Sequence, residues 1–385
     1  MSRLALPAAA QLETVAAKLD SVDRTLAEFM LMVNAGQEPI DLVDETVEAI
    51  FDLDNGLAHR DFHLGAVLGS IRNPSVEYVV KLVRAVLNVD RFLEKDKLKL
   101  TPQNGHRVVS VAGSGKKGVK TINISTPAAV VAASLGANVV KHASKGTSSA
   151  SGSSDFFCEV GGIPQDNRGA VDLLNRTGFG LFSIEGLIPK FDAMYGGRVL
   201  APTALSYALP ATVTPVKADS ILYGFSMPRL KESVLAIHQF GFDEVIGVNT
   251  TDDGVHYVDE AGIFRTNFMA HSRHGGREVT LSDPRDALRL ERTYSLTGIA
   301  QKSSREKNIA AGVDVLRGRG EEVQNMVIAL NAAIMLKLSG LVEDLREGFL
   351  LALSKILSGE PFEKLDEIVQ ASGGQFNNKV YGCAA

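Results

Sequence analysis

Two short loops rich in small and polar residues could hold a negatively charged ligand. The first, Gly113-Ser-Gly115-Lys-Lys-Gly118, follows a β-branched run at 107–112, and glycine lets the backbone approach a ligand closely. The second loop is rich in serine and ends at Asp155. Free backbone N–H groups and hydroxyls at strand ends suit an anion. The spacing therefore predicts an anion site built from two neighbouring strand ends.

The segment between these loops, Asn123-Ile-Ser125-Thr126-Pro127, predicts the start of a helix. Ser125 or Thr126 can cap the first turn, and Pro127 fits that turn. Capping explains one hydroxyl, but it does not explain three polar side chains after a glycine loop. The partial positive charge at a helix start suits a phosphate. We therefore expect this helix start to share the ligand of the first loop.

Two familiar phosphate loops do not fit these residues. A P-loop needs a lysine where Val119 stands, although Gly113 and Gly118 have the required spacing. A dinucleotide fingerprint needs a third glycine in the right place and an acidic residue about twenty positions later, and neither is present. On the glycines alone, a plain strand–turn–helix connection remains the alternative.

Charged side chains at two further strand ends could take part. Lys141 and His142 end the next predicted strand, where a single histidine is typical of a structural role. Asp243 and Glu244 begin a later strand, and adjacent carboxylates there are normally solvated. Beside a polyphosphate they would be good magnesium ligands, because this hard cation prefers oxygen.

Composition narrows the class of protein. A chain of 385 residues, 45% hydrophobic and 22% charged, can form two domains with sizeable cores. The net charge of -5 gives no electrostatic signature of nucleic-acid binding. Cys158 and Cys383 lie too far apart to suggest a disulfide framework or a zinc site. No apolar run could span a bilayer and no secretion signal is evident, so we expect a cytoplasmic enzyme without a membrane partner.

The elements that position these residues change in kind near residue 100. Apolar residues recur every three or four positions from Leu12 to Val33, which predicts an amphipathic helix. This apolar face suits either a dimer interface or packing within its own domain. Further helices are expected at 41–54, 61–71 and 75–90, with a linker at 95–104.

After residue 107, short runs of valine and isoleucine alternate with helical stretches. The predicted strands are 107–112, 138–142, 220–225, 243–248 and 256–258. Residues 162–197 and 304–371 are expected to be mainly helical, 252–254 a hairpin turn and 271–277 an exposed loop. This alternation predicts an α/β fold whose central sheet is mostly parallel and flanked by helices. We expect a helical domain at 1–100, joined by part of 162–200, and an α/β domain at 101–385.

Taken together, these motifs resemble the anthranilate phosphoribosyltransferase family. The family's Gly-Thr-Gly-Gly-Asp loop and its Asn-Ile-Ser-Thr segment resemble Gly113–Lys117 and Asn123–Thr126 at the same spacing. Its Lys-His-Gly-Asn-Arg segment and Ser-Gly-Ser-Ser-Asp loop resemble Lys141–Lys145 and Ser151–Asp155. Its Gly-Leu-Asp-Glu motif resembles Gly241–Glu244, and the helix containing Ala329-Leu-Asn-Ala-Ala333 is similar. The resemblance covers nearly the whole chain, in order.

The resemblance implies a small helical domain hinged to a larger α/β domain, in a homodimer formed through the helical part. It also implies Mg²⁺-dependent transfer of the phosphoribosyl group of phosphoribosyl diphosphate to an aromatic or related small-molecule acceptor. The transition state of such a transfer resembles an oxocarbenium ion, and positioned donors and magnesium stabilise the departing diphosphate. The implied catalytic residues are Lys141 and Asn123. The implied substrate-binding residues are Gly113, Ser114, Gly115, Lys116, Lys117, Asn123, Ser125, Thr126, Lys141, Ser144, Ser149 and Ser153. The implied metal ligands are Ser125, Ser153, Asp243 and Glu244.

The chain departs from the family pattern where the acceptor would bind. Ser144 replaces the family asparagine that helps to hold anthranilate, and Pro202 stands where the family has an arginine. Lys116 and Lys117 replace a Gly-Asp pair of the family. The two lysines either form a solvated charge pair or contact the diphosphate. We therefore expect an acceptor other than anthranilate. Two alternatives are a nucleoside phosphorylase-like enzyme and a non-catalytic nucleic-acid-binding paralogue.

Overall fold

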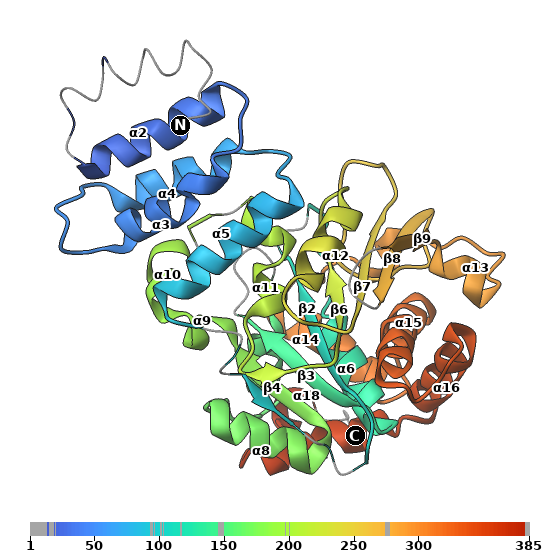
Figure 1. The fold of residues 1–385 in the computed structure, drawn as a ribbon. Helices are drawn as coiled ribbons and strands as arrows, with labels where there is room; N and C mark the ends of the chain where they lie inside the picture. The colour runs from blue at the N-terminus through green and yellow to red at the C-terminus, as the bar shows by residue number, and fades with distance from the viewer. Residues whose placement is uncertain are drawn as a thin grey trace.

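Four helices form a separate group at the N-terminal end of the chain (Figure 1). The computed structural model describes residues 14, 19, 21–92, 95, 97–100, 102, 104–115, 118–144, 150–196, 198–199, 201–273 and 278–381. The helices are α2 (Ser21–Asn34), α3 (Val43–Phe51), α4 (Arg60–Ser70) and α5 (Val76–Val89). The hydroxyl of Ser75 caps α5 by accepting a hydrogen bond from the backbone of Tyr78. The predicted N-terminal helices are thus confirmed where the structure describes them.

The apolar face of α2 is buried within this group of helices. Leu26 and Phe29 are buried and belong to the same apolar cluster as α3 and α5. Of the two interpretations of the apolar face at residues 12–33, the described part therefore supports packing within the domain.

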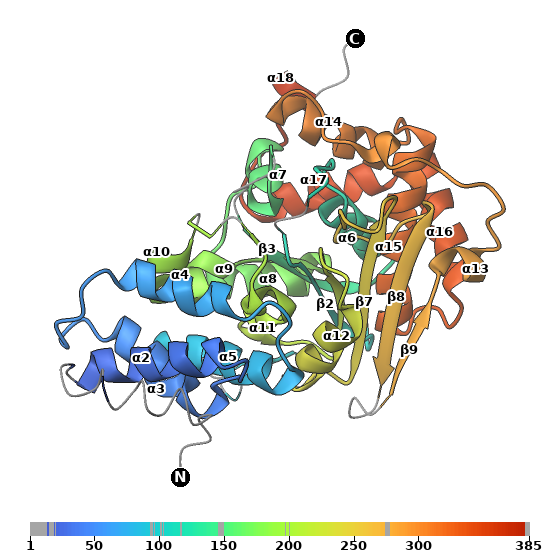
Figure 2. The same ribbon diagram turned by 90° about the horizontal axis from the view of Figure 1, so that it is seen from above.

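A seven-stranded sheet forms the centre of the rest of the chain (Figure 2). Its strands are β2 (Val108–Gly113), β3 (Asn138–Ala143), β4 (Phe179–Ser183), β6 (Ser220–Gly224), β7 (Glu244–Thr251), β8 (Thr266–Arg273) and β9 (Val279–Ser282). The strand order is β4-β3-β2-β6-β7-β8-β9. The first five strands run parallel to one another, and β8 pairs antiparallel with both β7 and β9. Two short strands, β1 (Leu98–Lys99) and β5 (Val216–Lys217), form a separate parallel pair.

Helices cover both faces of this sheet, and side chains alternate between two apolar cores. Val109 and Val111 of β2 enter one core, whereas Val108 and Ala112 enter the other. The first core contains α6 (Ser125–Ser134), α14 (Arg305–Leu316), α15 (Glu322–Ser339), α16 (Leu345–Ser358) and α17 (Pro361–Ala371). The second contains α10 (Pro189–Tyr195), α11 (Leu209–Thr212), α12 (Leu230–His238) and the N-terminal helices, so one apolar core joins them to the sheet.

The remaining helices connect or cap these layers. They are α7 (Ser153–Glu159), α8 (Asn167–Thr177), α9 (Ile184–Leu187), α13 (Pro284–Leu288), α18 (Asn378–Tyr381) and the short 3₁₀ turns η1 (Ile40–Leu42), η3 (Ala204–Tyr207) and η4 (Leu296–Ile299). No helix among the described residues is both long and apolar enough to cross a membrane. The predicted α/β fold with an N-terminal helical part is confirmed.

Three local predictions differ from the structure. Residues 162–197 contain β4 as well as helices, because Phe179–Ser183 pairs with β3. Residues 271–273 are not an exposed loop but the end of β8, where Arg273 pairs with Glu244; the rest of that predicted loop, 274–277, lies outside the described residues. The expected strand at 256–258 is reduced to a single bridge between Val258 and Thr250.

The order of the strands creates a switch point between β2 and β6. From β2 the chain proceeds outward to β3 and β4, and it then returns to β6 and β7 on the other side of β2. In open parallel sheets, ligands bind outside the carboxyl ends of the strands at such a switch point. Gly113 and Gly224 are the paired last residues of β2 and β6, so the first glycine loop begins at this position.

Candidate active site

Two serines join the loops that leave β2 and β6 at the switch point. The Ser114 and Ser226 hydroxyl oxygens lie 2.9 Å apart, and the backbone N–H of Ser226 donates to the Ser114 hydroxyl. The Ser226 hydroxyl in turn donates to the carbonyl of Gly115 at 2.7 Å. Gly115 has a φ of 61°, a left-handed conformation that glycine adopts without strain. These bonds hold residues 113–115, the start of the first glycine loop, in a defined conformation.

A buried acidic segment lies across the same strand ends. Asp259 accepts a hydrogen bond at Oδ2 from the backbone N–H of Gly115, at 3.0 Å. A Cβ atom at Gly113 would lie 2.8 Å from this oxygen, and one at Gly224 would overlap the Asp259 carbonyl oxygen. The glycines that end β2 and β6 therefore leave room for Asp259 and the adjacent Glu260, both of which are buried.

An asparagine of α15 fixes the chain immediately after this acidic pair. Asn331 is fully buried, and its side chain accepts from the N–H of Ala261 and donates to the carbonyl of the same residue, at 3.1 and 3.0 Å. Because both backbone groups of Ala261 are satisfied by one side chain, Asn331 sets the position of Asp259 and Glu260 at the switch point.

The sequence-based metal pair lies at the opposite edge of the sheet. Glu244 begins β7 and is paired with Ser220 at the start of β6, whereas Gly224 at the end of β6 is paired with Val248. Asp243 and Glu244 are thus near the amino ends of the strands, and their prediction as magnesium ligands beside the glycine loop is wrong. The missed residues are Asp259 and Glu260, an acidic pair that follows the carboxyl end of β7.

Glu244 instead belongs to an ion-pair network. Its carboxylate contacts Arg107 at 2.9 Å, His271 at 2.7 Å and Arg273 at 2.7 Å. Burial alone would raise the pKa of Glu244, but hydrogen bonds from His271 and Arg273 outweigh burial and lower this pKa to about 2. The network joins β7 and β8 to the start of β2, which is a structural role.

A polar cluster links the helix start after the first loop to the serine-rich loop. The Ser151 hydroxyl donates to Asn123 Oδ1 at 2.5 Å, and Asn123 Nδ2 donates to the Gly152 carbonyl at 3.3 Å. Asn308 of α14, which the sequence analysis did not single out, donates to the Ser151 hydroxyl at 2.9 Å. Asn308 is fully buried among helical residues, so no local pattern identified it.

The predicted serines and threonine lie at helix starts on this side of the sheet. Ser125 and Thr126 are the first two residues of α6, but Ile124 occupies the capping position and no side chain caps the helix. Ser153 is the first residue of α7, and the carbonyl of Ser144 accepts a hydrogen bond from the next residue, Ser154. The expectation that Ser125 or Thr126 caps α6 is therefore wrong, because the helix begins one residue earlier than a cap requires.

Lys141 and His142 are both buried at the end of β3, between β2 and β4. The Lys141 amine donates to the carbonyl of His142 at 2.9 Å. The His142 ring contacts the hydroxyl of Ser110 at 2.6 Å. Burial, followed by the charge of Lys141, lowers the pKa of His142 to about 3, so the ring is neutral near pH 7. These contacts indicate a structural role for His142.

Some predicted residues lie outside the described part of the chain. These are Lys116, Lys117 and Ser149. Among the described residues, no group of three or more histidine, cysteine, aspartate or glutamate side chains could hold a metal ion. A cation bound by Asp259 and Glu260 would therefore also need oxygen atoms from a bound substrate. Magnesium bound to a polyphosphate has such oxygen ligands.

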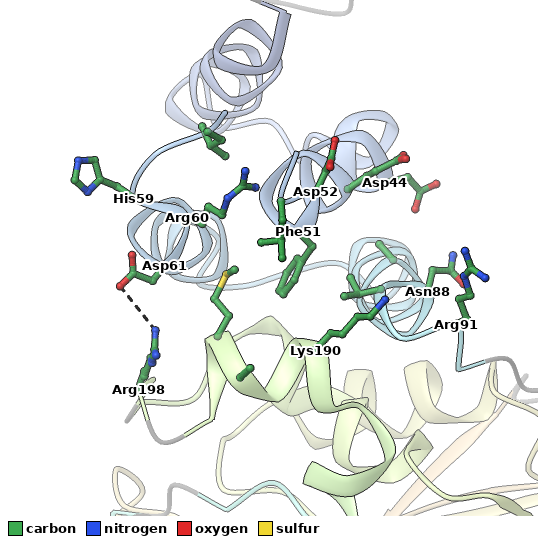
Figure 3. Close-up of a pocket in the computed structure, with 17 residues that line it drawn as sticks. Asp44, Phe51, Asp52, His59, Arg60, Asp61, Asn88, Arg91, Lys190 and Arg198 are labelled. Atoms are coloured by element: carbon green, nitrogen blue, oxygen red, sulfur yellow. Dashed lines mark ion pairs between the residues drawn. The ribbon is translucent and has the colours of Figure 1, made fainter. Parts of the chain in front are cut away.

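A cleft of about 1270 Å³ opens elsewhere, between α3, α4, α5 and α10 (Figure 3). Acidic and basic side chains are mixed along it, and Asp61 lies 3.9 Å from Arg198. None of the residues predicted for the anion site lines this cleft. The mixture of charges gives it no evident preference for a diphosphate.

Comparison with known proteins agrees with this geometry. Residues 105–362 match the family described as glycosyl transferase family, a/b domain. The anthranilate phosphoribosyltransferase of Pyrobaculum arsenaticum is 32% identical over 267 residues, which cover 69% of this chain and 77% of that protein. The enzyme of the same name from Shewanella baltica is 28% identical over 289 residues, covering 69% of this chain and 73% of that protein.

Solved structures of that name share the fold. The crystal structure from Thermus thermophilus has a TM-score of 0.71 at 20% identity and covers 92% of this chain and 100% of that one. The Saccharomyces cerevisiae structure in complex with PRPP and Mg has a TM-score of 0.70 at 19% identity, covering 91% and 98%. The family match over residues 105–362 and the 32% identity show that the chain belongs to the anthranilate phosphoribosyltransferase family of pentosyl-transferring enzymes.

Proposed function

We propose that this protein transfers the phosphoribosyl group of phosphoribosyl diphosphate to a small aromatic or related acceptor, with Mg²⁺ bound to the diphosphate. The observation that carries the proposal is the hydrogen bond from Gly115 to Asp259 at the β2–β6 switch point. It lies where a carboxylate meets the start of the glycine loop at the carboxyl ends of the strands, and this position suits a carboxylate ligand for magnesium bound to a diphosphate.

The reaction breaks the C1–O bond of the ribose, and the electron pair leaves with the diphosphate. The start of α6, beside Gly113, Ser114 and Gly115 of the glycine loop, would hold the departing charge, and it lowers the barrier because it stabilises the transition state more than the substrate. Magnesium, when bound, neutralises diphosphate charge. Asp259 and Glu260 would hold the cation together with Ser125 and Ser153.

The side chains behind this loop would keep the substrate in place. Asn123, which contacts Ser151 and Gly152, would share the ribose phosphate side of the ligand with Thr126. Lys141 would supply positive charge near the same phosphates. Lys116, Lys117, Ser144 and Ser149 remain proposed contacts.

We infer that the acceptor is not anthranilate. By the resemblance, Ser144 replaces the family asparagine that helps to hold anthranilate, and Pro202 replaces a family arginine. A proline cannot form an ion pair with a carboxylate, so an acceptor recognised through that charge would bind weakly.

Calorimetric titration with phosphoribosyl diphosphate, with and without Mg²⁺, tests the phosphoribosyl half of the proposal. We expect binding that depends on magnesium, followed by turnover in an acceptor screen that starts with anthranilate. Binding of inorganic phosphate and a nucleoside, with no magnesium-dependent binding of phosphoribosyl diphosphate, would favour phosphorolysis. Salt-sensitive DNA binding without either would favour the nucleic-acid-binding alternative. Rapid turnover of anthranilate would refute the inference about the acceptor.

We also propose a two-domain homodimer in the cytoplasm, with one domain at 1–100 and part of 162–200 and the other at 101–385. Phe51 of α3 lies 5.7 Å from Phe191 of α10 between ring centroids, which supports assigning α10 to the helical domain. Leu53 and Phe62 are more than two-thirds exposed on this part of the molecule and could be covered by a second copy. A monomer in sedimentation equilibrium would rule out the dimer.

A further inference from the structure

The segment 300–308, which leads from η4 into α14, connects the two loops of the site. The backbone N–H of Gln301 donates to the carbonyl of Lys120 at 3.0 Å, just before the chain enters α6. The Gln301 side chain accepts a hydrogen bond at Oε1 from the backbone N–H of Ala150, at 2.9 Å, near the end of the serine-rich loop. The last residue of the segment, Asn308, belongs to α14, which packs beside α6 and α7 (Figure 2).

The amide of Asn308 has only one orientation that suits its neighbours. Its Oδ1 accepts a hydrogen bond from the backbone N–H of Lys302 at 3.1 Å. A backbone N–H can only donate, so the donor end of the amide, Nδ2, faces the Ser151 hydroxyl at 2.9 Å. Asn308 and Ser151 are both buried. Turning the amide over would therefore leave buried donors and acceptors mismatched, which costs free energy.

This orientation determines which end of Asn123 is available to a ligand. The Ser151 hydroxyl accepts from Asn308, and it gives its single hydrogen to Asn123 Oδ1 at 2.5 Å. Asn308 Nδ2 also lies 3.4 Å from the same oxygen. Asn123 therefore presents Nδ2 on its other side, where the Gly152 carbonyl accepts at 3.3 Å. Among the residues that the structure describes, Gly152 is the only acceptor for this nitrogen, so the second N–H of the partly exposed Asn123 can donate to a ligand.

We propose that Asn308 is a positioning residue that fixes the amide of Asn123, through Ser151, so that Asn123 donates an N–H to a phosphate oxygen of the substrate. This inference rests on the phosphoribosyl transfer proposed above and on Asn123 as a substrate contact. In the reversed amide, the carbonyl oxygen of Asn123 would face the phosphate, and neither group could donate a hydrogen bond. The buried series of hydrogen bonds from Lys302 to Asn123 therefore favours an anionic ligand.

Replacing Asn308 with aspartate reverses this series of hydrogen bonds. Aspartate still accepts from the Lys302 N–H, but it has no N–H to give, so the Ser151 hydroxyl donates to the new carboxylate. The Asn123 amide then turns Nδ2 toward the carboxylate and Oδ1 toward the ligand. We expect the affinity for phosphoribosyl diphosphate with Mg²⁺ to fall about 30-fold, about tenfold from the lost charge-assisted hydrogen bond and about threefold from the added negative charge.

A double-mutant cycle separates the effect that passes through Asn123 from other effects of the aspartate. Affinities are measured by calorimetric titration of the full chain with phosphoribosyl diphosphate and Mg²⁺. Asn123→Ala alone should bind about tenfold more weakly, and Asn308→Asp in that background should cost only about threefold more. The added charge acts on the ligand in both backgrounds, so the tenfold difference between the two costs measures the effect that passes through Asn123. A purely structural role of Asn308 would lower the affinity by the same factor in both.

The matched control is Asn138→Asp, at the amino end of β3 and thus at the opposite edge of the sheet. Asn138 is also buried, and its Nδ2 donates to Asn104 at 2.8 Å and to the carbonyl of His106 at 3.2 Å. This variant should lower the melting temperature, as Asn308→Asp does, but it should change the affinity less than about twofold.

Ser151→Ala repeats the cycle without a buried charge, and it decides the question if Asn308→Asp does not fold. It removes the hydrogen bond to Asn123 Oδ1 and should weaken binding about threefold, but not measurably in the Asn123→Ala background.

Three outcomes would overturn the proposal. Normal affinity in Asn123→Ala would show that this side chain makes no contact with the ligand. Equal costs of the second substitution in both backgrounds would show that Asn308 and Ser151 do not act through Asn123. An equal loss in Asn138→Asp would show a general effect of a buried charge. If the unaltered protein does not bind phosphoribosyl diphosphate, the proposed function fails first, and this result is recognised without any variant.

Discussion

Replacing Asp259 with asparagine should weaken binding of phosphoribosyl diphosphate in the presence of Mg²⁺ by about 100-fold. The substitution keeps the shape of the side chain and an acceptor for the Gly115 N–H, which lies 3.0 Å from Asp259 Oδ2. It removes the charge, which weakens this hydrogen bond in the free and the bound protein alike and therefore lowers stability rather than affinity. It also removes an attraction to the divalent cation of up to about 8 kcal/mol at 4 Å and an effective dielectric constant of 20, twice the value for two unit charges. Phosphate counter-charge opposes part of this attraction, and a net loss of about 3 kcal/mol corresponds to the 100-fold change.

The matched control is Asp243→Asn, which removes the same charge at the other edge of the sheet. Asp243 is exposed near the amino end of β7, so its replacement should change affinity less than about twofold. Both variants are titrated calorimetrically at several Mg²⁺ concentrations, with thermal unfolding to confirm that they are folded. A large loss in Asp243→Asn together with normal affinity in Asp259→Asn would refute the assignment of the metal pair.

Two further substitutions test the supports of the site, and a third tests the ion-pair network of Glu244. Gly224→Ala should displace the chain at Asp259, because the added methyl group would overlap the Asp259 carbonyl oxygen, and we expect binding to be lost and the melting temperature to fall. Asn331→Ala leaves both backbone groups of Ala261 without their side-chain partner, so denaturant unfolding should show a loss of about 2–4 kcal/mol. The pKa of Glu244, about 2 in the folded protein against an ordinary 4.5, is depressed, so its stabilisation is complete above pH 4.5 and is lost as the pH falls toward 2. Glu244→Gln should therefore cost about 2–3 kcal/mol at pH 7 and far less at pH 2, measured by urea unfolding, and an equal cost at both pH values would contradict this explanation.

Local sequence patterns predicted most of the fold. The period of apolar residues located α4 and α5 to within a residue or two, and the valine-rich runs located β2, β3, β6 and β7. The strand β4 escaped detection because Phe179–Ser183 contains two phenylalanines and a glycine between helical segments, and its pairing with β3 decides its conformation. The strands β8 and β9 were missed for a similar reason, since their polar residues are held by pairing with β7 and with each other.

The site shows where sequence reasoning reached its limit. The glycine loop, Asn123 and the serine-rich loop were identified because their residues are close along the chain. The sequence analysis took Asp243-Glu244 from its resemblance to the family's Gly-Leu-Asp-Glu motif and did not consider Asp259-Glu260, another acidic pair beside a predicted strand. Only the pairing of β6 with β7 shows that the first pair lies at the amino ends and that the second lies beyond the carboxyl ends. A sequence rule that asks whether an acidic pair precedes or follows its strand would have separated them.

The apolar core that the N-terminal helices share with one face of the sheet has a consequence for motion and for melting. Because Phe29 and Tyr78 belong to the same buried cluster as Tyr223 and Val245 of the sheet, the helical part cannot swing away without exposing apolar surface to water. Any closure over a ligand would therefore be a small sliding of packed helices, a shear motion. Heating should accordingly melt both parts in a single calorimetric peak, and damage to a helix far from the ligand should reduce the amount of folded protein rather than the activity of each folded molecule.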